Sequence, residues 1–119
     1  MPRYALLLHT DAPDDPSGSH YDLLLEDGSA CRTWRLPRLP IQGDGALEAT
    51  PLPDHRLIWL EQRSAAVSRG RGWAERVMAG SYSGSLPANR HDALLVTLID
   101  GELRGNLRIH EGACSLSRT

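Results

Sequence analysis

Short apolar runs of strand length, separated by turn residues, restrict the fold of this chain more than any other feature of its sequence. Tyr4–His9 is one such run, and Tyr21–Glu26 and Ala30–Leu36 flank an Asp-Gly-Ser turn at residues 27–29. An Asp-Gly turn between two strand-length runs predicts a β-hairpin. The loop at residues 10–19, rich in Pro, Asp, Gly and Ser, separates this hairpin from the first run.

A second hairpin is predicted near the C-terminus, where the apolar segment Asp92–Ile99 and the alternating segment Leu103–His110 flank another Asp-Gly turn. Pro37–Pro53 is rich in Pro and Gly and is predicted to be irregular, and Arg56–Glu61 indicates a strand or one helical turn. Ser64–Met78 is the longest candidate helix, although its glycines disfavour a helix.

Many short strands at regular spacing are typical of an antiparallel barrel or sandwich. We therefore predict a single domain over residues 1–119 that is all-β and mainly antiparallel. Its expected form is a small closed or partly open β-barrel with at most short helices.

Charge, hydropathy and cysteine content exclude several classes of function. The formal net charge is -2, so contact with nucleic acid would require a local basic patch, although all 13 basic residues are arginines suited to phosphate. No segment is long and apolar enough to cross a membrane, and no secretory signal is evident. Two isolated cysteines without a CxxC motif favour a reduced, cytoplasmic setting, and we expect a monomer.

The tetrapeptide His20-Tyr21-Asp22-Leu23 begins a predicted strand and indicates a metal site. Residues two apart in a strand share one face, so the side chains of His20 and Asp22 project together. An imidazole beside a carboxylate provides half of a divalent-metal site. An isolated His-x-Asp pair is more often an exposed pair on a solvated strand, so the assignment depends on other residues.

Two further histidines are candidates for this site. His9 ends the first predicted strand, and the loop that follows it can fold back to bring it to His20. His55 follows Pro51-Leu52-Pro53-Asp54, a stiff segment that fixes its direction, although a surface or capping role is equally compatible. His91 and His110 lie in polar segments and are predicted to be surface residues. There is no nucleophile elbow, phosphate loop or zinc-type Cys/His spacing.

Four strings occur in a defined order: HYDLLLE, TWRLPRLP, LPDHRL and GRGWAERVMAGSY. Together they resemble the 3′-phosphoesterase domain of bacterial non-homologous end-joining DNA ligase D and its small stand-alone relatives. The resemblance extends from about residue 4 to about residue 82. It implies a small β-barrel that binds manganese or a similar divalent ion and removes phosphate, or a terminal ribonucleotide, from DNA 3′ ends.

The resemblance also implies roles for individual residues. The His-x-Asp metal pair of the family falls on His20 and Asp22, and its upstream His ligand falls near His9, although the intervening loop is longer here. The downstream Asp-His falls on residues 54 and 55, which makes His55 the candidate catalytic residue in contact with the scissile phosphate.

Two positions depart from the family pattern. The family has an Arg two residues after the Asp ligand, and this chain has Leu24. It has a Tyr four residues after the downstream His, and this chain has Trp59, which keeps an N–H donor. We therefore expect weak activity, which Leu24→Arg would raise if the scaffold keeps its geometry. The candidate substrate-binding groups are Arg69, Arg71 and Arg76 near the Gly-Arg-Gly turn, together with Trp59. An arginine in such a position is more often a solvated surface residue.

Three functions remain open. The first is a phosphoesterase dependent on manganese, zinc or another divalent metal, acting on nucleic-acid 3′ ends or another phosphate ester. The second is a non-catalytic barrel that keeps the metal pocket and binds DNA ends or a DNA-repair protein partner. The third is a non-haem iron oxygenase-like site, since His20, Asp22 and His55 also suit a facial triad.

Overall fold

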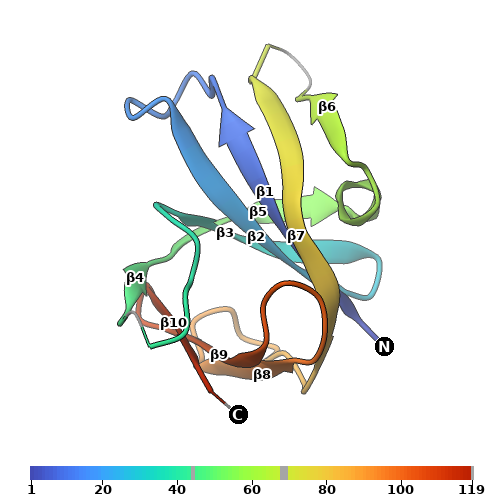
Figure 1. Ribbon diagram of the computed structural model, residues 1–119, viewed down its shortest axis with the longest axis vertical. Coiled ribbons are helices and arrows are strands. Elements are labelled where there is room, and N and C mark those ends of the chain that lie inside the picture. The colour runs from blue at the N-terminus through green and yellow to red at the C-terminus, as the bar shows by residue number, and fades with distance from the viewer. Residues whose placement is uncertain (44, 68–69, 119) are drawn as a thin grey trace.

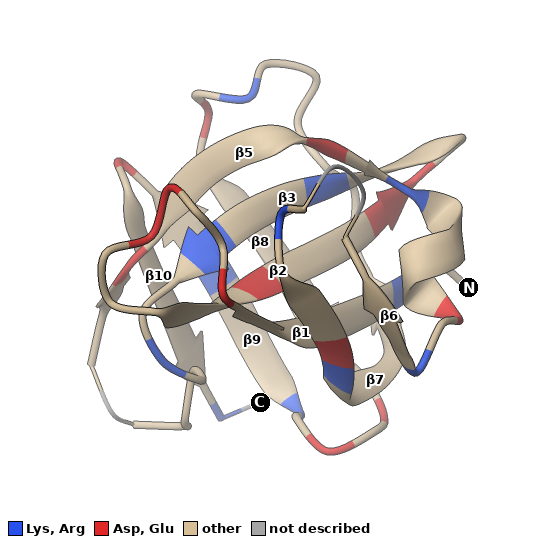
Figure 2. Ribbon diagram, turned by 90° about the horizontal axis from the view of Figure 1, so that it is seen from above, with Lys and Arg blue, Asp and Glu red and all other residues tan. Residues whose placement is uncertain are grey.

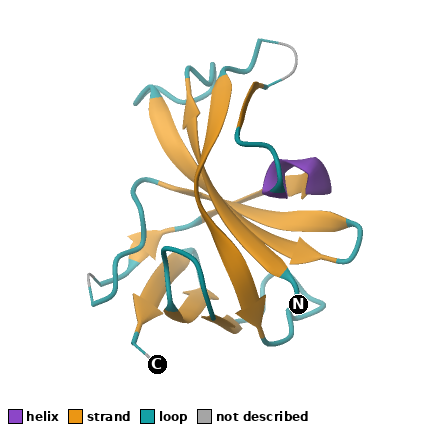
Figure 3. Ribbon diagram, turned by 45° about the vertical axis from the view of Figure 1, so that its right-hand side comes forward, coloured by secondary structure: helices purple, strands orange, loops and turns teal. Residues whose placement is uncertain are grey.

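The computed structural model describes residues 1–43, 45–67 and 70–118, which form a curved antiparallel sheet (Figure 1). The elements, in chain order, are β1 (Arg3–Thr10), β2 (Ser19–Asp27), β3 (Ala30–Leu36), β4 (Leu47–Glu48), β5 (Thr50–Arg56), the 3-10 helix η1 (Leu57–Leu60), β6 (Ser64–Ala66), β7 (Trp73–Ser83), β8 (Leu94–Leu98), β9 (Gly105–His110) and β10 (Ala113–Ser117). The predicted all-β, antiparallel class is therefore confirmed. Figure 3 shows η1, the only helix in the described residues, beside the long strands.

The sheet is a partly open barrel. Its strand order is β4-β10-β9-β8-β7-β1-β2-β3-β5, with β6 paired to β7 outside this path. The two end strands of that order, β4 and β5, are consecutive in the chain and are separated by Ala49 alone, which is buried and donates its N–H to the Gly112 carbonyl. Because β4 and β5 are adjacent in the chain but are not paired with each other, the barrel is open between these two strands.

The two predicted hairpins are present, one irregular segment was predicted wrongly in part, and the segment whose glycines disfavoured a helix contains strands. β2 pairs with β3, and β8 pairs with β9. Residues within Pro37–Pro53 were predicted to be irregular, but Thr50–Arg56 forms β5 at the end of the strand order, where prolines are tolerated because one edge needs no N–H donors. The helix candidate Ser64–Met78 instead supplies β6 and the first half of β7.

The strands β1, β2 and β3 are buried on both faces. One face contributes Leu6, Leu23 and Trp34 to the main hydrophobic core between this layer and β8–β10. The opposite face contributes a smaller apolar cluster, which η1 covers; its buried members are Ala5, Leu7, Leu24, Cys31, Leu60 and Ala74. Cys31 and Cys114 are both buried free thiols. The candidate site lies next to this smaller cluster, on the same face of β1 and β2.

Candidate metal centre

The end of β1 and the start of β2 continue the smaller apolar cluster with polar side chains. His9 pairs with His20 across these strands, and Leu7 pairs with Asp22. Directly opposed residues of an antiparallel pair lie on the same face. The face that is apolar at Ala5, Leu7 and Leu24 therefore becomes polar at His9, His20 and Asp22.

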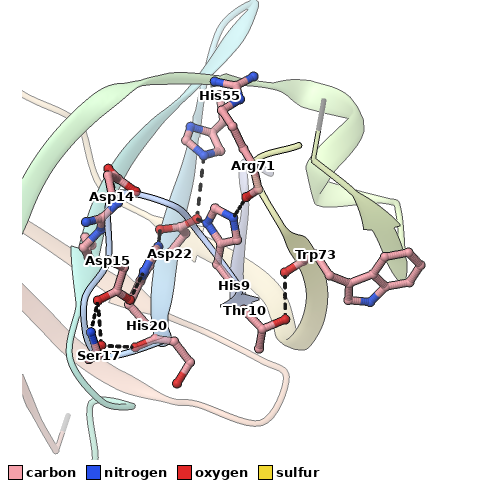
Figure 4. Close-up of polar contacts among 12 residues, drawn as sticks. His9, Thr10, Asp14, Asp15, Ser17, His20, Asp22, His55, Arg71 and Trp73 are labelled. Carbon is pink, nitrogen blue, oxygen red and sulfur yellow. Dashed lines mark hydrogen bonds and ion pairs between the residues drawn. The ribbon is translucent and has the colours of Figure 1, made fainter. Parts of the chain in front are cut away.

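The structure brings these three polar side chains into one cluster (Figure 4). One ligand atom from each of His9, His20 and Asp22 lies within 4.8 Å of the others. The shortest separations are 3.2 Å from His20 Nε2 to Asp22 Oδ1 and 3.5 Å from His9 Nδ1 to Asp22 Oδ2. His20 and Asp22 are only 3% and 2% exposed. The cluster is a possible metal-binding triad.

Asp15 orients the ring of His20. Its carboxylate lies 2.8 Å from His20 Nδ1 and accepts hydrogen bonds from the backbone N–H and the hydroxyl of Ser17. The bonds from Ser17, and then that from His20, lower the pKa of Asp15 to about 2, so the carboxylate is ionised and can only accept. His20 Nδ1 must then carry the proton, which leaves the lone pair of a neutral ring on Nε2, facing Asp22.

The carbonyl of Arg71 orients His9 in the same way. His9 Nε2 lies 2.6 Å from this oxygen and donates to it, so the lone pair of the neutral ring lies on Nδ1, toward Asp22. Gly72 permits the close approach of the two segments. Its φ is +94°, and a Cβ there would collide with the carbonyl oxygen of Thr10. The predicted turn at residues 70–72 therefore positions a ligand rather than binding one itself.

His55 faces the same carboxylate from β5. Its Nδ1 donates to the Pro53 carbonyl at 3.1 Å, and its Nε2 lies 3.8 Å from Asp22 Oδ2. The His55 side chain is 27% exposed, which makes it the most accessible of the three imidazoles. Figure 4 shows it approaching Asp22 from the opposite side to His20.

This arrangement places acceptor atoms against acceptor atoms. Three imidazoles donate their outer N–H to protein oxygens and direct their other nitrogen at one buried carboxylate. His20 Nε2 and Asp22 Oδ1 are 3.2 Å apart but are not aligned as a hydrogen bond, and neither has another partner among the described residues. Buried polar atoms without a partner are costly. A cation held between them, either a proton or a metal ion, removes that cost.

The electrostatic contacts favour the ionised carboxylate of Asp22 and the protonated ring of His9. Burial alone would raise the pKa of Asp22, but its contacts with His20, His55 and His9 outweigh burial and hold the pKa well below its usual range. The pKa of His9 is raised, chiefly by Asp22 and against the opposing effect of burial. A permanent carboxylate inside a ring of imidazoles matches the donor set of Mn²⁺, Fe²⁺ or Zn²⁺ sites.

The remaining predicted substrate-binding residues lie outside the triad. The guanidinium of Arg76 donates to the Leu60 carbonyl, and Trp59 packs against the smaller apolar cluster. Arg71 contributes its carbonyl to His9, as described above. Arg69 lies outside the described residues. The roles assigned to these four side chains stay predictions.

Two residues near the triad were missed by sequence reasoning. Asp15 lies in the acidic loop five residues before His20, and Arg35 is the cross-strand partner of Asp22 on β3. The predicted hairpin did not identify Arg35, because a three-residue turn at 27–29 would oppose residue 22 to residue 34, whereas the observed register pairs Asp27 with Ala30. No local pattern identifies which of the acidic loop residues contacts His20.

Replacing Asp15 by alanine is expected to weaken Mn²⁺ binding about tenfold to hundredfold, the usual cost of losing a partner that orients a ligand. Without this carboxylate, His20 can rotate or adopt the other tautomer. Calorimetric titration with Mn²⁺ measures the change, and Asp92→Ala, which removes an exposed carboxylate elsewhere, is the matched control. Equal affinities in the two variants would contradict the role of Asp15.

Comparison with models of known protein families and with curated proteins gave no match. Within the described part of the chain, no helix has the length and apolar character needed to span a membrane.

Proposed function

We propose that this protein is a divalent-metal-dependent phosphoesterase that acts on, or binds, the phosphorylated 3′ ends of nucleic acid, with manganese as the expected metal. The observation that carries the proposal is the convergence of His9, His20 and His55 on the buried carboxylate of Asp22, with each imidazole oriented by a protein oxygen. The ordered strings that resemble the ligase D phosphoesterase domain support it independently, because they assign the metal and phosphate roles to these same positions.

The chemistry divides between the triad and His55. His9, His20 and Asp22 would hold the ion, which when bound supplies a Lewis acid that polarises a phosphoryl oxygen and acidifies water. His55 is more exposed than His9 and His20 and is therefore accessible to substrate. In its protonated form it can stabilise negative charge on the phosphoryl oxygens or give a proton to the leaving oxygen.

One observation favours the non-catalytic alternative. Leu24, which replaces the arginine of the family pattern, is fully buried, and Trp59 packs against the same apolar cluster. A buried leucine side chain cannot hold a phosphate, and Trp59 is partly buried by its packing. A protein that binds metal and phosphorylated ends without turnover would fit these two positions. The oxygenase alternative is distinguished by its metal, because it requires Fe²⁺.

The decisive experiment is an assay of inorganic phosphate release from a 3′-phosphorylated DNA strand with Mn²⁺. We expect release by the wild-type protein, its loss with a chelator, and a reduction of at least about a hundredfold in His55→Ala, the usual scale for removing one stabilising contact. Calorimetric titration with Mn²⁺ should show that His55→Ala still binds metal, because His55 lies outside the triad.

The controls separate the three functions. Zn²⁺ and Fe²⁺ replace Mn²⁺ in parallel reactions, and His91→Ala removes an exposed imidazole distant in sequence from the site. Binding of the strand without release would favour the non-catalytic alternative. Release that survives both the chelator and His55→Ala would refute the proposed mechanism.

A further inference from the structure

The pairing of β2 with β3 places a cation, Arg35, beside the candidate metal centre. Arg35 is the cross-strand partner of Asp22 in the β2–β3 register, so the two side chains leave the sheet on the same face. Figure 2, seen from the end of the sheet that carries the site, shows basic and acidic segments next to one another across β3, β2 and the β1–β2 loop. The guanidinium is thus a neighbour of the triad, although it is not a metal ligand.

The hydrogen bonds of Arg35 are incomplete. Its Nη2 lies 3.2 Å from Oδ2 of Asp14, whose side chain is 72% exposed on the loop before His20. Its Nε is buried and has no hydrogen-bond partner among the described residues. A guanidinium donates through five N–H groups in a planar fork that matches a phosphate or carboxylate. The acceptor at Nη2 is thus a carboxylate on an exposed loop, and the adjacent buried Nε–H has no acceptor among the described residues.

Arg35 also forms an ion pair next to the triad, with Asp14 on the loop between β1 and β2. The ion pair with Arg35 is in turn the main reason that the pKa of Asp14 is lowered. A cation at this position repels a metal ion slightly and attracts an anion bound to that metal, which is the arrangement expected of a phosphate-binding arginine.

We propose that Arg35 binds the phosphate group of the substrate, and that Asp14 occupies the guanidinium until a phosphate oxygen replaces it. The inference deepens the proposed function and rests on it, because the phosphate is taken to lie at the metal centre. It also explains how a phosphate can be held although residue 24 is a buried leucine. The guanidinium comes from β3, the neighbour of β2, and reaches the same face of the sheet.

The test is calorimetric titration of inorganic phosphate into the Mn²⁺-loaded protein. We expect Arg35→Ala to weaken phosphate binding about tenfold to hundredfold, the range for a charge-assisted hydrogen bond. Arg35→Lys keeps the charge but loses the fork, so it should fall between wild type and alanine. Asp14→Asn should tighten phosphate binding severalfold, because it removes the competing carboxylate. If Arg35 had only a structural role, Asp14→Asn would not tighten phosphate binding while Arg35→Ala weakens it.

Arg108→Ala is the charge-matched control, because Arg108 is an exposed arginine on β9. Thermal melts identify any variant that is unfolded, in which case Arg35→Lys and Asp14→Asn alone decide the outcome. Titration of Mn²⁺ into Arg35→Ala should show undiminished metal affinity. Phosphate binding that depends on Arg35, without release from a 3′-phosphorylated strand, would support this inference and refute catalysis. Phosphate binding that is absent in the wild type, or unchanged in Arg35→Ala and Asp14→Asn, would overturn it.

Discussion

Asp22→Asn is expected to reduce Mn²⁺ affinity by more than about a hundredfold, because it removes the only anionic ligand of the triad. The carboxylate of Asp22 is the atom group toward which His9, His20 and His55 all direct a ring nitrogen. A neutral amide offers a weaker oxygen ligand and no charge. The measurement is the rise in melting temperature on adding Mn²⁺, which follows metal affinity when metal binds only the folded protein.

The same variant should be stable without metal. The amide N–H₂ group introduced by the substitution can donate to the lone pair of a ring nitrogen that otherwise faces an oxygen acceptor. We therefore expect metal-free Asp22→Asn to melt no lower than metal-free wild type at pH 8. Asp92→Asn, at an exposed position, should leave both melting temperatures unchanged. Metal-free Asp22→Asn that is strongly destabilised, or that keeps its response to Mn²⁺, would show that the cluster is structural.

Leu24→Arg is expected to destabilise the protein by about 3–5 kcal/mol, comparable to leaving a buried charge without a partner. The family resemblance predicted a gain of activity from this change, on the condition that the scaffold keeps its geometry. In the structure, Leu24 is 0% exposed and packs with Leu7, Cys31 and Leu60 beneath η1. A guanidinium at this position would lie among apolar side chains.

Urea denaturation of the metal-free proteins measures this loss of stability. Leu24→Met, which changes shape but little volume, should cost less than about 1.5 kcal/mol and is the matched control. A Leu24→Arg variant that is as stable as wild type and releases phosphate faster would show that residue 24 can reach the site, and would restore the expectation from the family pattern.

Local patterns predicted the parts of the molecule that depend on neighbouring residues in the chain. An Asp-Gly-Ser turn between two strand-length runs correctly predicted the β2–β3 hairpin, and the period of two in a strand placed the side chains of His20 and Asp22 on one face. The error at β5 has a cause that lies outside the local pattern. The prolines of β5 suggested an irregular segment because their effect depends on whether a strand is central or at an edge.

Burial was decided by the tertiary structure. The sequence indicated an apolar side chain at Leu24 but not whether it faced water or a second layer. Residues of η1 and β7 pack against the face of the sheet that carries the ligands. This packing buries residue 24, so a position that holds an arginine in the family pattern is part of an apolar core here. The same packing buries Asp22, which strengthens its contacts with the surrounding imidazoles.

By itself, the sequence determined the strand that carries His20 and Asp22, because alternation along a strand is a property of adjacent residues. Only the tertiary structure decided which groups complete the site. His9 arrives through the β1–β2 pairing, His55 through the β3–β5 pairing, and Arg35 through the register of β2 with β3. The oxygens that orient the imidazoles come from Asp15 and from the carbonyls of Pro53 and Arg71. A carbonyl is present at every residue, so only the path of the folded backbone determines which one reaches a histidine.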